Sequence, residues 1–163
     1  MTIKVGDTIP SVTLKRLGDQ GMEDVNTVDY FKGKKIVLFA TPGAFTPTCA
    51  QKHLPGYVNN ADKIKAQGVD EIICLSVNDP FVMRHWGETA NANGKVTMLP
   101  DGNAQFVQAL GLTMDGSGFG LGTRAQRFSM VIENNLVTDL AVEPAAGNVE
   151  LSGAEICLVK LGA

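Results

Sequence analysis

The chain has 163 residues, of which 44% are hydrophobic and 19% are charged, and its formal net charge is −3. A chain of about 100–200 residues with this composition usually forms one folded unit, so we expect a single domain over residues 1–163. Seventeen acidic residues against fourteen basic ones, without a polybasic run, argue against nucleic acid or an anionic membrane surface as the main partner.

The beginning of the chain and its cysteines bear on location and on metal binding. Residues 1–7 lack the layout of a secretory signal peptide, and no apolar stretch approaches the roughly 20 residues that span a bilayer, so we expect a cytoplasmic protein. Cys49, Cys74 and Cys157 are too few and too widely spaced for a disulfide framework. With two histidines and no C-x-x-C, we expect no metal site, and we expect no bound cofactor.

The first elements along the chain are extended. Alternating apolar and polar residues predict a strand over 11–17, followed by a turn at 18–21 and a weaker partner strand over 25–31. The continuous apolar run Ile36–Ala40 is typical of a strand that is covered on both faces. We therefore place Ile36–Ala40 at the centre of the sheet.

The next segment is predicted to be a loop and then a helix. Thr41–Cys49 holds two prolines and a glycine, which favours a loop, and Pro47 suits the first turn of a helix. Apolar spacing predicts that helix over 50–66, and Pro55 with its neighbouring glycine should divide it into two segments.

The second half of the chain continues the alternation of strands and helices. We expect a strand over 71–77, then a helix capped by Asn78–Pro80 and running to about Ala90, and then a strand over 96–99. A helix over 101–111 and a glycine-rich loop over 111–122 follow. The chain then forms strands over 127–133 and 136–142, joined by an Asn134-Asn135 turn, and a terminal helix opened by a capping box at Ser152–Glu155. This order predicts an α/β protein with a mixed sheet between helices.

Cys49 is the strongest candidate for chemistry. It stands where a loop after a central strand becomes a helix, and there the helix dipole and unpaired N–H groups favour a thiolate. Ligand sites of open α/β sheets also lie outside the carboxyl ends of their strands. The alternative from position alone is a small apolar side chain packed in a helix, because free cysteine is often buried.

The residues around Cys49 carry a family resemblance. The segment Pro42–Cys49, PGAFTPTC, resembles the P-x-x-x-T-x-x-C signature of the peroxiredoxins. Its continuation AQKHLPGY over 50–57, together with SVNDPFVM over 76–83 and GTRAQRFSM over 122–130, is similar to the type II peroxiredoxins. The resemblance covers nearly the whole chain, and it implies a thioredoxin-like fold.

The resemblance also implies an activity and a set of catalytic residues. Cys49 would be the peroxidatic cysteine, which reduces hydrogen peroxide and alkyl hydroperoxides and becomes a sulfenic acid. Pro42 would shield the thiolate from water, the Thr46 hydroxyl would hydrogen-bond at the site, and Arg127 would complete it. A hydroxyl and a guanidinium aimed at the two peroxide oxygens stabilise the transition state, where charge develops on the departing oxygen.

Arg124 and His53 offer alternatives at this site. Arg124 competes with Arg127 for the arginine role, but Arg127 directly precedes the strand, as in the family motif, while Arg124 is expected at a loop end or as a solvated charge. His53 lies one helical turn after Cys49, so a cysteine hydrolase with a Cys–His pair is a rival hypothesis. Pro55 and the lack of an orienting Asn or Asp weaken it, and we expect His53 to be a packing or helix-surface residue.

Two apolar or glycine-rich stretches have simpler interpretations. Residues 116–122 do not follow the G-x-G-x-x-G spacing, so we expect a flexible rim near the site, with Phe119 and Leu121 as apolar contacts, instead of a nucleotide loop. The apolar side chains at 81–83 and Trp86 fit either the core or, by the resemblance, the surface of a homodimer.

The reduction of the oxidised enzyme depends on the other cysteines. Family members that form a disulfide within one chain carry a resolving cysteine before the last helix, where this chain has residues 148–151 without one. Cys74 and Cys157 lie among apolar neighbours and are expected in the core. This favours reduction by glutathione, often with glutaredoxin, while thioredoxin is an alternative reductant. A further alternative is a redox sensor or holdase that signals through oxidation of Cys49.

Overall fold

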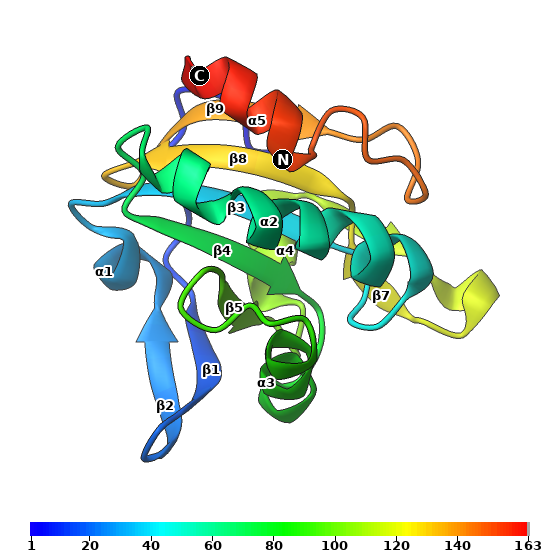
Figure 1. The fold of residues 1–163 in the computed structure, drawn as a ribbon. Helices are drawn as coiled ribbons and strands as arrows, with labels where there is room; N and C mark the ends of the chain where they lie inside the picture. Colours follow the sequence, from blue (N-terminus) through cyan, green and yellow to red (C-terminus); the bar gives the residue numbers. More distant parts are fainter. Residues whose placement is uncertain (163) are drawn as a thin grey trace.

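The computed structural model describes residues 1–162, and its centre is a five-stranded sheet in the order β5-β4-β3-β8-β9 (Figure 1). Two small antiparallel hairpins, β1-β2 and β6-β7, stand apart from it. The strands are β1 Thr13–Gly18, β2 Gly21–Asn26, β3 Lys35–Thr41, β4 Glu71–Ser76, β5 Thr97–Pro100, β6 Thr113–Asp115, β7 Thr123–Ala125, β8 Phe128–Glu133 and β9 Leu136–Val142. The helices are α1 Thr27–Phe31, the π-turn η1 Cys49–His53, α2 Leu54–Lys65, α3 Pro80–Thr89, α4 Gln105–Leu110, the 3₁₀ turn η2 Ser117–Phe119 and α5 Ala154–Leu161.

The central sheet is mixed, as the order of elements predicted. β3 is parallel to β4 and β4 is parallel to β5, while β8 runs antiparallel to both β3 and β9. β3 is therefore the middle strand, as predicted, and α2 connects the parallel strands β3 and β4 in a βαβ unit. Asn134 and Asn135, both at positive φ, join β8 to β9 in the predicted turn.

The sheet buries a hydrophobic cluster on each face, because successive side chains of a strand point to opposite sides. Val37 and Phe39 pack with α2, α5 and α3, whereas Ile36 and Leu38 pack with α1, α4 and the β1-β2 hairpin. β3 is buried along nearly its whole length, which confirms the prediction of a strand covered on both faces. Figure 1 shows α2 and α5 side by side, and the structure records many contacts between them.

The N-terminal hairpin differs from the prediction. The partner of β1 is β2, at 21–26, and the predicted partner strand over 25–31 is wrong because Thr27–Phe31 forms helix α1. Asn26 caps this helix by accepting a hydrogen bond from the N–H of Asp29. The helix buries Phe31 against Phe106 of α4. A side-chain cap and tertiary burial thus outweigh the weak strand signal.

The helix after β3 is interrupted near the predicted position, but by a π-turn. The Leu54 N–H donates to the Cys49 carbonyl, five residues earlier, before regular α2 continues. Pro55 supplies no N–H, and its ring would crowd the carbonyl of Gln51, so an unbroken α-helical ladder is not available here.

Two further predictions need correction. The glycine-rich segment 111–122 is not a simple loop, because it contains β6 and the η2 turn and leads into β7. The capping box at Ser152–Glu155 is also wrong: the N-cap of α5 is Gly153, which makes no side-chain cap. The Ser152 hydroxyl instead donates to Glu143.

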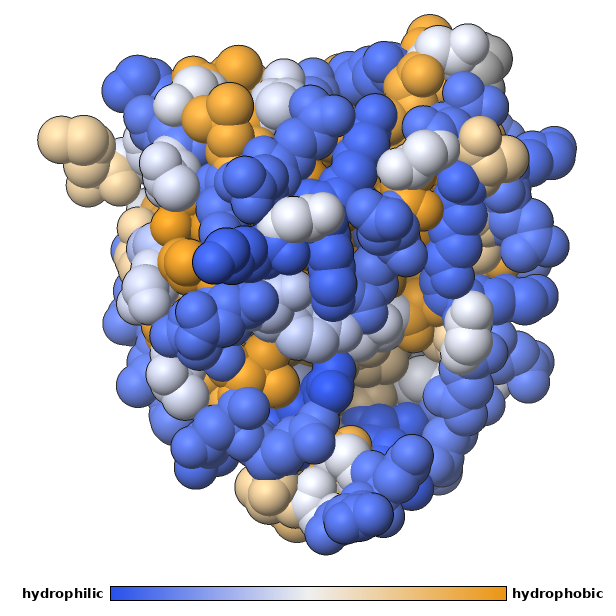
Figure 2. Space-filling model, turned by 90° about the vertical axis from the view of Figure 1, so that its left-hand side faces the viewer, coloured by the Kyte–Doolittle hydropathy of each residue, from blue (hydrophilic) through white to orange (hydrophobic). Residues whose placement is uncertain are grey.

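The surface opposite the carboxyl end of β3 is polar. Figure 2 shows this side of the molecule as mostly hydrophilic, with apolar atoms only in small, separate groups. Among residues 1–162, none of the helices has the length and apolar character needed to cross a bilayer.

Candidate active site

Cys49 lies at the start of the π-turn, two residues after the helical segment begins at Pro47. Its side chain is buried, with 1% of its surface exposed, and it belongs to the apolar cluster between the sheet and α2. The preceding loop is fixed to the segment between β4 and α3, because the side-chain oxygen of Asn78 accepts a hydrogen bond of 2.9 Å from the N–H of Ala44. The sulfur is therefore held at the carboxyl end of β3.

Arg127 reaches the same place from the residue just before β8, the strand that pairs with β3 on the side away from β4. Phe128 pairs with Ala40 in the β3-β8 ladder, so Arg127 lies beside the end of β3, where the Cys49 loop starts. Its Nη2 donates to the Cys49 sulfur at 2.9 Å. The guanidinium is 2% exposed, so water screens its positive charge little.

His53 contacts the other side of the guanidinium. Its Nε2 lies 3.0 Å from the Ser152 carbonyl oxygen, and its Nδ1 lies 2.8 Å from Arg127 Nη1. A carbonyl oxygen only accepts, so Nε2 carries the proton and Nδ1 accepts from Arg127. Burial, and then the positive charge of Arg127, lower the pKa of His53 to about 3. His53 is therefore a neutral, fully buried histidine: it packs against Phe39, as one of the two expectations had it, and it does not lie on the helix surface.

The loop between β9 and α5 closes the arrangement. Its Ala146 carbonyl accepts a 2.9 Å bond from Arg127 Nε. The N–H and hydroxyl of Ser152 and the N–H of Leu151 all donate to Oε2 of Glu143. Burial raises the pKa of the Glu143 carboxyl, but these hydrogen bonds outweigh it, and the net pKa lies below its ordinary value.

Thr46 and Pro42 lie on the loop that leads to Cys49. The Thr46 hydroxyl donates to the Gly43 carbonyl at 2.6 Å, which leaves its oxygen lone pairs as acceptors. Pro42 is buried, at the point where the chain leaves β3. The structure therefore places Arg127 in direct contact with both Cys49 and His53, with Thr46 and Pro42 on the adjoining turn.

Arg124 takes a different position from Arg127. It lies on β7, and it donates to the Leu121 carbonyl at 2.8 Å and to the Pro42 carbonyl at 3.3 Å. A Cβ atom at Gly43 would come within 2.9 Å of the Arg124 guanidinium, so a larger residue here would require the end of the Arg124 side chain to move. Arg124 is neither a solvated charge nor the arginine that contacts the sulfur; it packs against the loop.

Comparisons with known proteins identify the family of this chain. Residues 4–158 match the Redoxin family. Peroxiredoxin-2C of Arabidopsis thaliana is 42% identical over 160 residues, which cover 98% of each chain. Reduced Prx3 of Vibrio vulnificus, solved in complex with hydrogen peroxide, is 52% identical, with a TM-score of 0.94 over 98% of this chain and 99% of that one. Peroxiredoxin 5 of Alvinella pompejana is 36% identical, with a TM-score of 0.84 over 98% and 97% of the two chains.

The chain is a type II peroxiredoxin. It has the thioredoxin-like fold expected from the resemblance. Peroxiredoxins are thiol peroxidases, and Cys49 is the peroxidatic cysteine of this one. The rival hypothesis of a cysteine hydrolase is wrong, and the geometry gives the reason: the His53 nitrogen that a hydrolase would turn toward the thiol accepts a hydrogen bond from Arg127.

The other two cysteines of this peroxiredoxin are buried and free. Cys74 lies next to Phe39 in the β3-β4 pairing, on the face covered by α2, and burial and the nearby Cys49 raise the pKa of its thiol well above the ordinary value. Cys157 is 4% exposed in α5, and burial and Asp139 raise the pKa of its thiol to about 11. Both are core thiols, as the sequence predicted.

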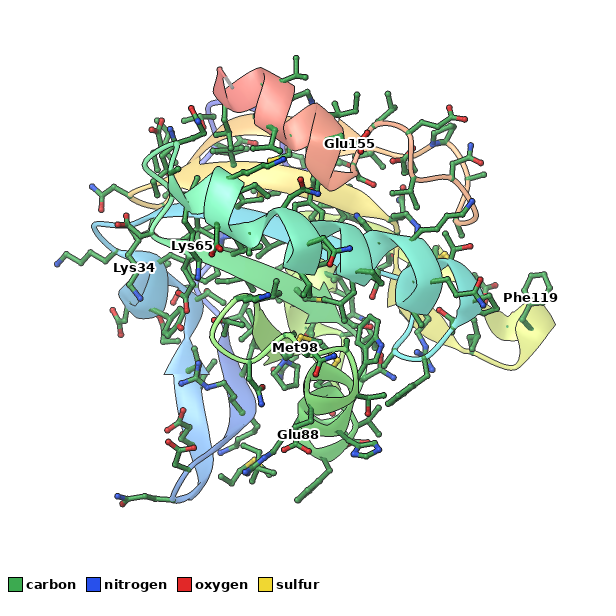
Figure 3. The ribbon with its side chains drawn as sticks, viewed as in Figure 1. Lys34, Lys65, Glu88, Met98, Phe119 and Glu155 are labelled. Atoms are coloured by element: carbon green, nitrogen blue, oxygen red, sulfur yellow. The ribbon has the colours of Figure 1, made fainter. Side chains whose placement is uncertain are left out.

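The apolar residues near the peroxiredoxin site divide into two groups. Met83 and Trp86 lie on the buried side of α3, whereas Phe81 of the same helix is 62% exposed. Phe45 is also exposed, and its ring lies 6.2 Å from that of Trp86. Phe119 projects from the η2 turn away from the body of the molecule (Figure 3) and does not contact the site as an apolar rim.

Sequence reasoning missed Glu143 of this peroxiredoxin site, and it placed His53 near the site without its contact with Arg127. His53 belongs to the AQKHLPGY segment, but a single histidine four residues after a cysteine does not reveal that its partner is an arginine 74 positions later. Glu143 follows β9 and binds the loop at 151–152. A carboxylate directly after the half-buried edge strand β9 was the only local signal for it.

Proposed function

We propose that this peroxiredoxin reduces hydrogen peroxide and small alkyl hydroperoxides to water and alcohols, with Cys49 as nucleophile and with Arg127, Thr46 and Pro42 as the other residues of its site. The 2.9 Å hydrogen bond from Arg127 Nη2 to the Cys49 sulfur carries this proposal. The relative from Vibrio vulnificus was solved with hydrogen peroxide, which supports the choice of substrate.

The reaction forms one bond and breaks one. The Cys49 thiolate attacks a peroxide oxygen, an S–O bond forms, the O–O bond breaks, and the electron pair leaves with the second oxygen, which takes a proton and departs as water or an alcohol. The guanidinium of Arg127 stabilises the negative charge that moves from sulfur to oxygen. Thr46 accepts a hydrogen bond from the peroxide O–H, because its own proton is committed to Gly43. Pro42 keeps water from the thiolate.

Reduction by an external thiol completes the cycle. Glutathione attacks the Cys49 sulfenic acid, giving a mixed disulfide and water, and a second thiol from glutathione or glutaredoxin releases Cys49 in its reduced form. The burial of Cys74 and Cys157 supports an external donor, because neither thiol is free to move to Cys49 without unpacking the core. The cytoplasm, where glutathione keeps thiols reduced, is the compartment that this cycle requires.

A homodimer is part of the same proposal. Phe45 and Phe81 are exposed on and beside α3, and large exposed aromatic side chains are enriched where protein surfaces meet. Each subunit of the homodimer would be the single domain over 1–163.

Steady-state peroxide consumption with three reductants tests the function. The assay compares glutathione, glutathione with glutaredoxin, and thioredoxin. We expect turnover with glutathione, increased by glutaredoxin, and its complete loss in Cys49→Ser. The matched controls, Cys74→Ser and Cys157→Ser, keep glutathione-dependent turnover. Loss of glutathione-dependent turnover in either control contradicts the one-cysteine cycle. Turnover with thioredoxin and none with glutathione contradicts the choice of glutathione as the reductant.

The redox-sensor alternative gives a different result in the same assay. A sensor or holdase would turn over slowly with every reductant and would form a stable partner complex only after oxidation of Cys49. Retention of peroxide consumption in Cys49→Ser would overturn the assignment of the nucleophile.

A further inference from the structure

The buried guanidinium of Arg127 has only neutral hydrogen-bond acceptors apart from the Cys49 sulfur. Its Nε donates to the Ala146 carbonyl, its Nη1 to His53 and its Nη2 to Cys49, so each of the three nitrogens has a partner. None of the ion pairs formed by residues 1–162 involves Arg127. The positive charge is therefore not neutralised by a carboxylate and remains available to the sulfur.

His53 is itself held in one orientation. The Ser152 carbonyl that accepts from its Nε2 also accepts a 2.6 Å bond from the Tyr57 hydroxyl. Ser152 is held in place in turn, because its N–H and its hydroxyl both donate to Glu143. The ring also packs against Phe39, with 4.8 Å between the ring centroids. With Nε2 committed as a donor, Nδ1 is turned to Arg127 as an acceptor.

We propose that His53 is a positioning residue of this peroxidase site: as a neutral acceptor it orients the Arg127 guanidinium toward Cys49 and leaves its charge for the sulfur and the reacting oxygens. The inference rests on the proposed function, because it assigns His53 a part in the reaction at Cys49. His53 has no contact with the reacting atoms in this role and acts through Arg127.

The neutrality of the acceptor is what matters electrostatically. A carboxylate in the place of His53 would also accept from Nη1, but its negative charge would compete with the thiolate for the guanidinium in a region of low dielectric. The charged groups that face His53 are Arg127 from the start of β8 and Glu143 from the end of β9. Oε2 of Glu143 accepts all three hydrogen bonds from the loop at 151–152, and its Oε1 makes no hydrogen bond among the described residues, so Arg127 does not bind this carboxylate.

An isosteric pair of variants tests this inference. His53→Asn keeps a neutral acceptor near the position of Nδ1, and His53→Asp has the same shape with a negative charge. His53→Leu removes the acceptor, and Tyr57→Phe removes the other donor to the Ser152 carbonyl without touching Arg127. Two readouts are the single-turnover rate of Cys49 oxidation by hydrogen peroxide and the pH midpoint of Cys49 alkylation by iodoacetamide, followed on the Cys49 peptide by mass spectrometry.

We expect the rate of Cys49 oxidation in His53→Asp and His53→Leu to fall on the order of tenfold to a hundredfold, which is less than the fall caused by removing a group that donates directly to the transition state. The pH midpoint of Cys49 alkylation in these two variants should rise by about one pH unit. His53→Asn should stay within about fivefold of the wild type, and Tyr57→Phe within about twofold, although both lose a hydrogen bond. Thermal melting shows that each variant is folded at the assay temperature.

Two results would overturn the inference. One is a His53→Asp protein as fast as His53→Asn, which would mean that charge at this position is irrelevant. The other is a His53→Asn protein as slow as a folded His53→Asp, which would mean that any loss of the imidazole is equally harmful. If His53→Leu does not fold, the comparison of His53→Asn with His53→Asp still tests the inference.

The alkylation readout separates this inference from the proposed function, because it needs no peroxide. If the wild type does not reduce peroxide but the Asp variant still raises the alkylation midpoint, the proposed function fails and the positioning role stands. If peroxide is reduced normally and neither readout moves in any variant, the positioning role fails alone.

Discussion

The sulfur of Cys49 and Nη2 of Arg127 lie 2.9 Å apart, although the two residues are 78 positions apart in the sequence. The antiparallel pairing of β8 with β3 produces this proximity, because Phe128 lies opposite Ala40. The sheet, and not a flexible loop, therefore sets the distance between the nucleophile and the charge that assists it.

Replacement of Arg127 by lysine tests whether geometry matters in addition to charge. Arg127→Lys keeps the positive charge but loses the fork that contacts Cys49, His53 and Ala146 at the same time. We expect the second-order rate constant for oxidation of Cys49 by hydrogen peroxide to fall on the order of a hundredfold. Arg84→Gln, at an exposed ion pair with Glu88, is the matched control and should not change the rate. Equal rates for Arg127→Lys and the wild type would contradict the role given to the guanidinium.

The hydroxyl of Thr46 is tested by two substitutions of similar size. Thr46→Val removes the oxygen that binds Gly43 and faces the peroxide in the proposed reaction, and we expect the same rate constant to fall on the order of a hundredfold. Thr46→Ser restores the oxygen and should recover most of the rate. A valine variant that reacts as fast as the serine variant would show that the hydroxyl only shapes the loop.

Buried His53 makes the protein sensitive to acid. Its pKa is about 3 when folded and near 6.5 when unfolded, so below pH 6.5 the unfolded chain binds a proton that the folded chain does not. Stability therefore falls as the pH decreases, by about 2 kcal/mol between pH 7 and pH 5 from this residue. Urea unfolding at the two pH values measures the fall. In His53→Asn the fall should be smaller by that amount, and an unchanged fall would show that His53 is not its source.

Glu143 is expected to stabilise the loop that follows β9. Glu143→Ala leaves the N–H groups of Leu151 and Ser152 and the Ser152 hydroxyl without their acceptor, at a cost of about 2–4 kcal/mol in the free energy of unfolding. Glu143→Gln keeps one acceptor oxygen and should cost less. Denaturant titration distinguishes the two variants, and a Gln variant as unstable as the Ala variant would mean that the negative charge itself is required.

Much of the fold could be predicted because its signals are local. The apolar runs of β3 and β4, the Asp79 cap of α3 and the Asn134-Asn135 turn are each contained in a few consecutive residues. Asp79 accepts hydrogen bonds from the N–H groups of Phe81 and Val82, as a capping aspartate should. The choice of Cys49 and Arg127 rested on short motifs of the same local kind.

What escaped prediction depends on distant partners. Ser152 looked like the start of a capping box, but its hydroxyl binds Glu143, which is brought beside it by the turn of the chain after β9. His53 looked like a packing residue because its partners Arg127 and Ser152 lie 74 and 99 positions further along the chain. The predicted strand at 25–31 was wrong because a helix here buries Phe31 against α4, which stabilises the helix over the strand.

The π-turn at Cys49–His53 has a consequence for the tolerance of this region to insertion and deletion. Leu54, Tyr57, Ala61 and Ile64 mark the buried side of α2, and a regular helix extended backwards would bring Ala50 to that side. The wider turn brings Cys49 there instead, five residues before Leu54. An ordinary α-helical turn over the same residues would move the sulfur by about 100° around the helix axis, away from this side, and one inserted residue would displace it by a similar angle. An insertion should therefore be far more damaging here than changes of side chain at exposed Gln51 or Lys52.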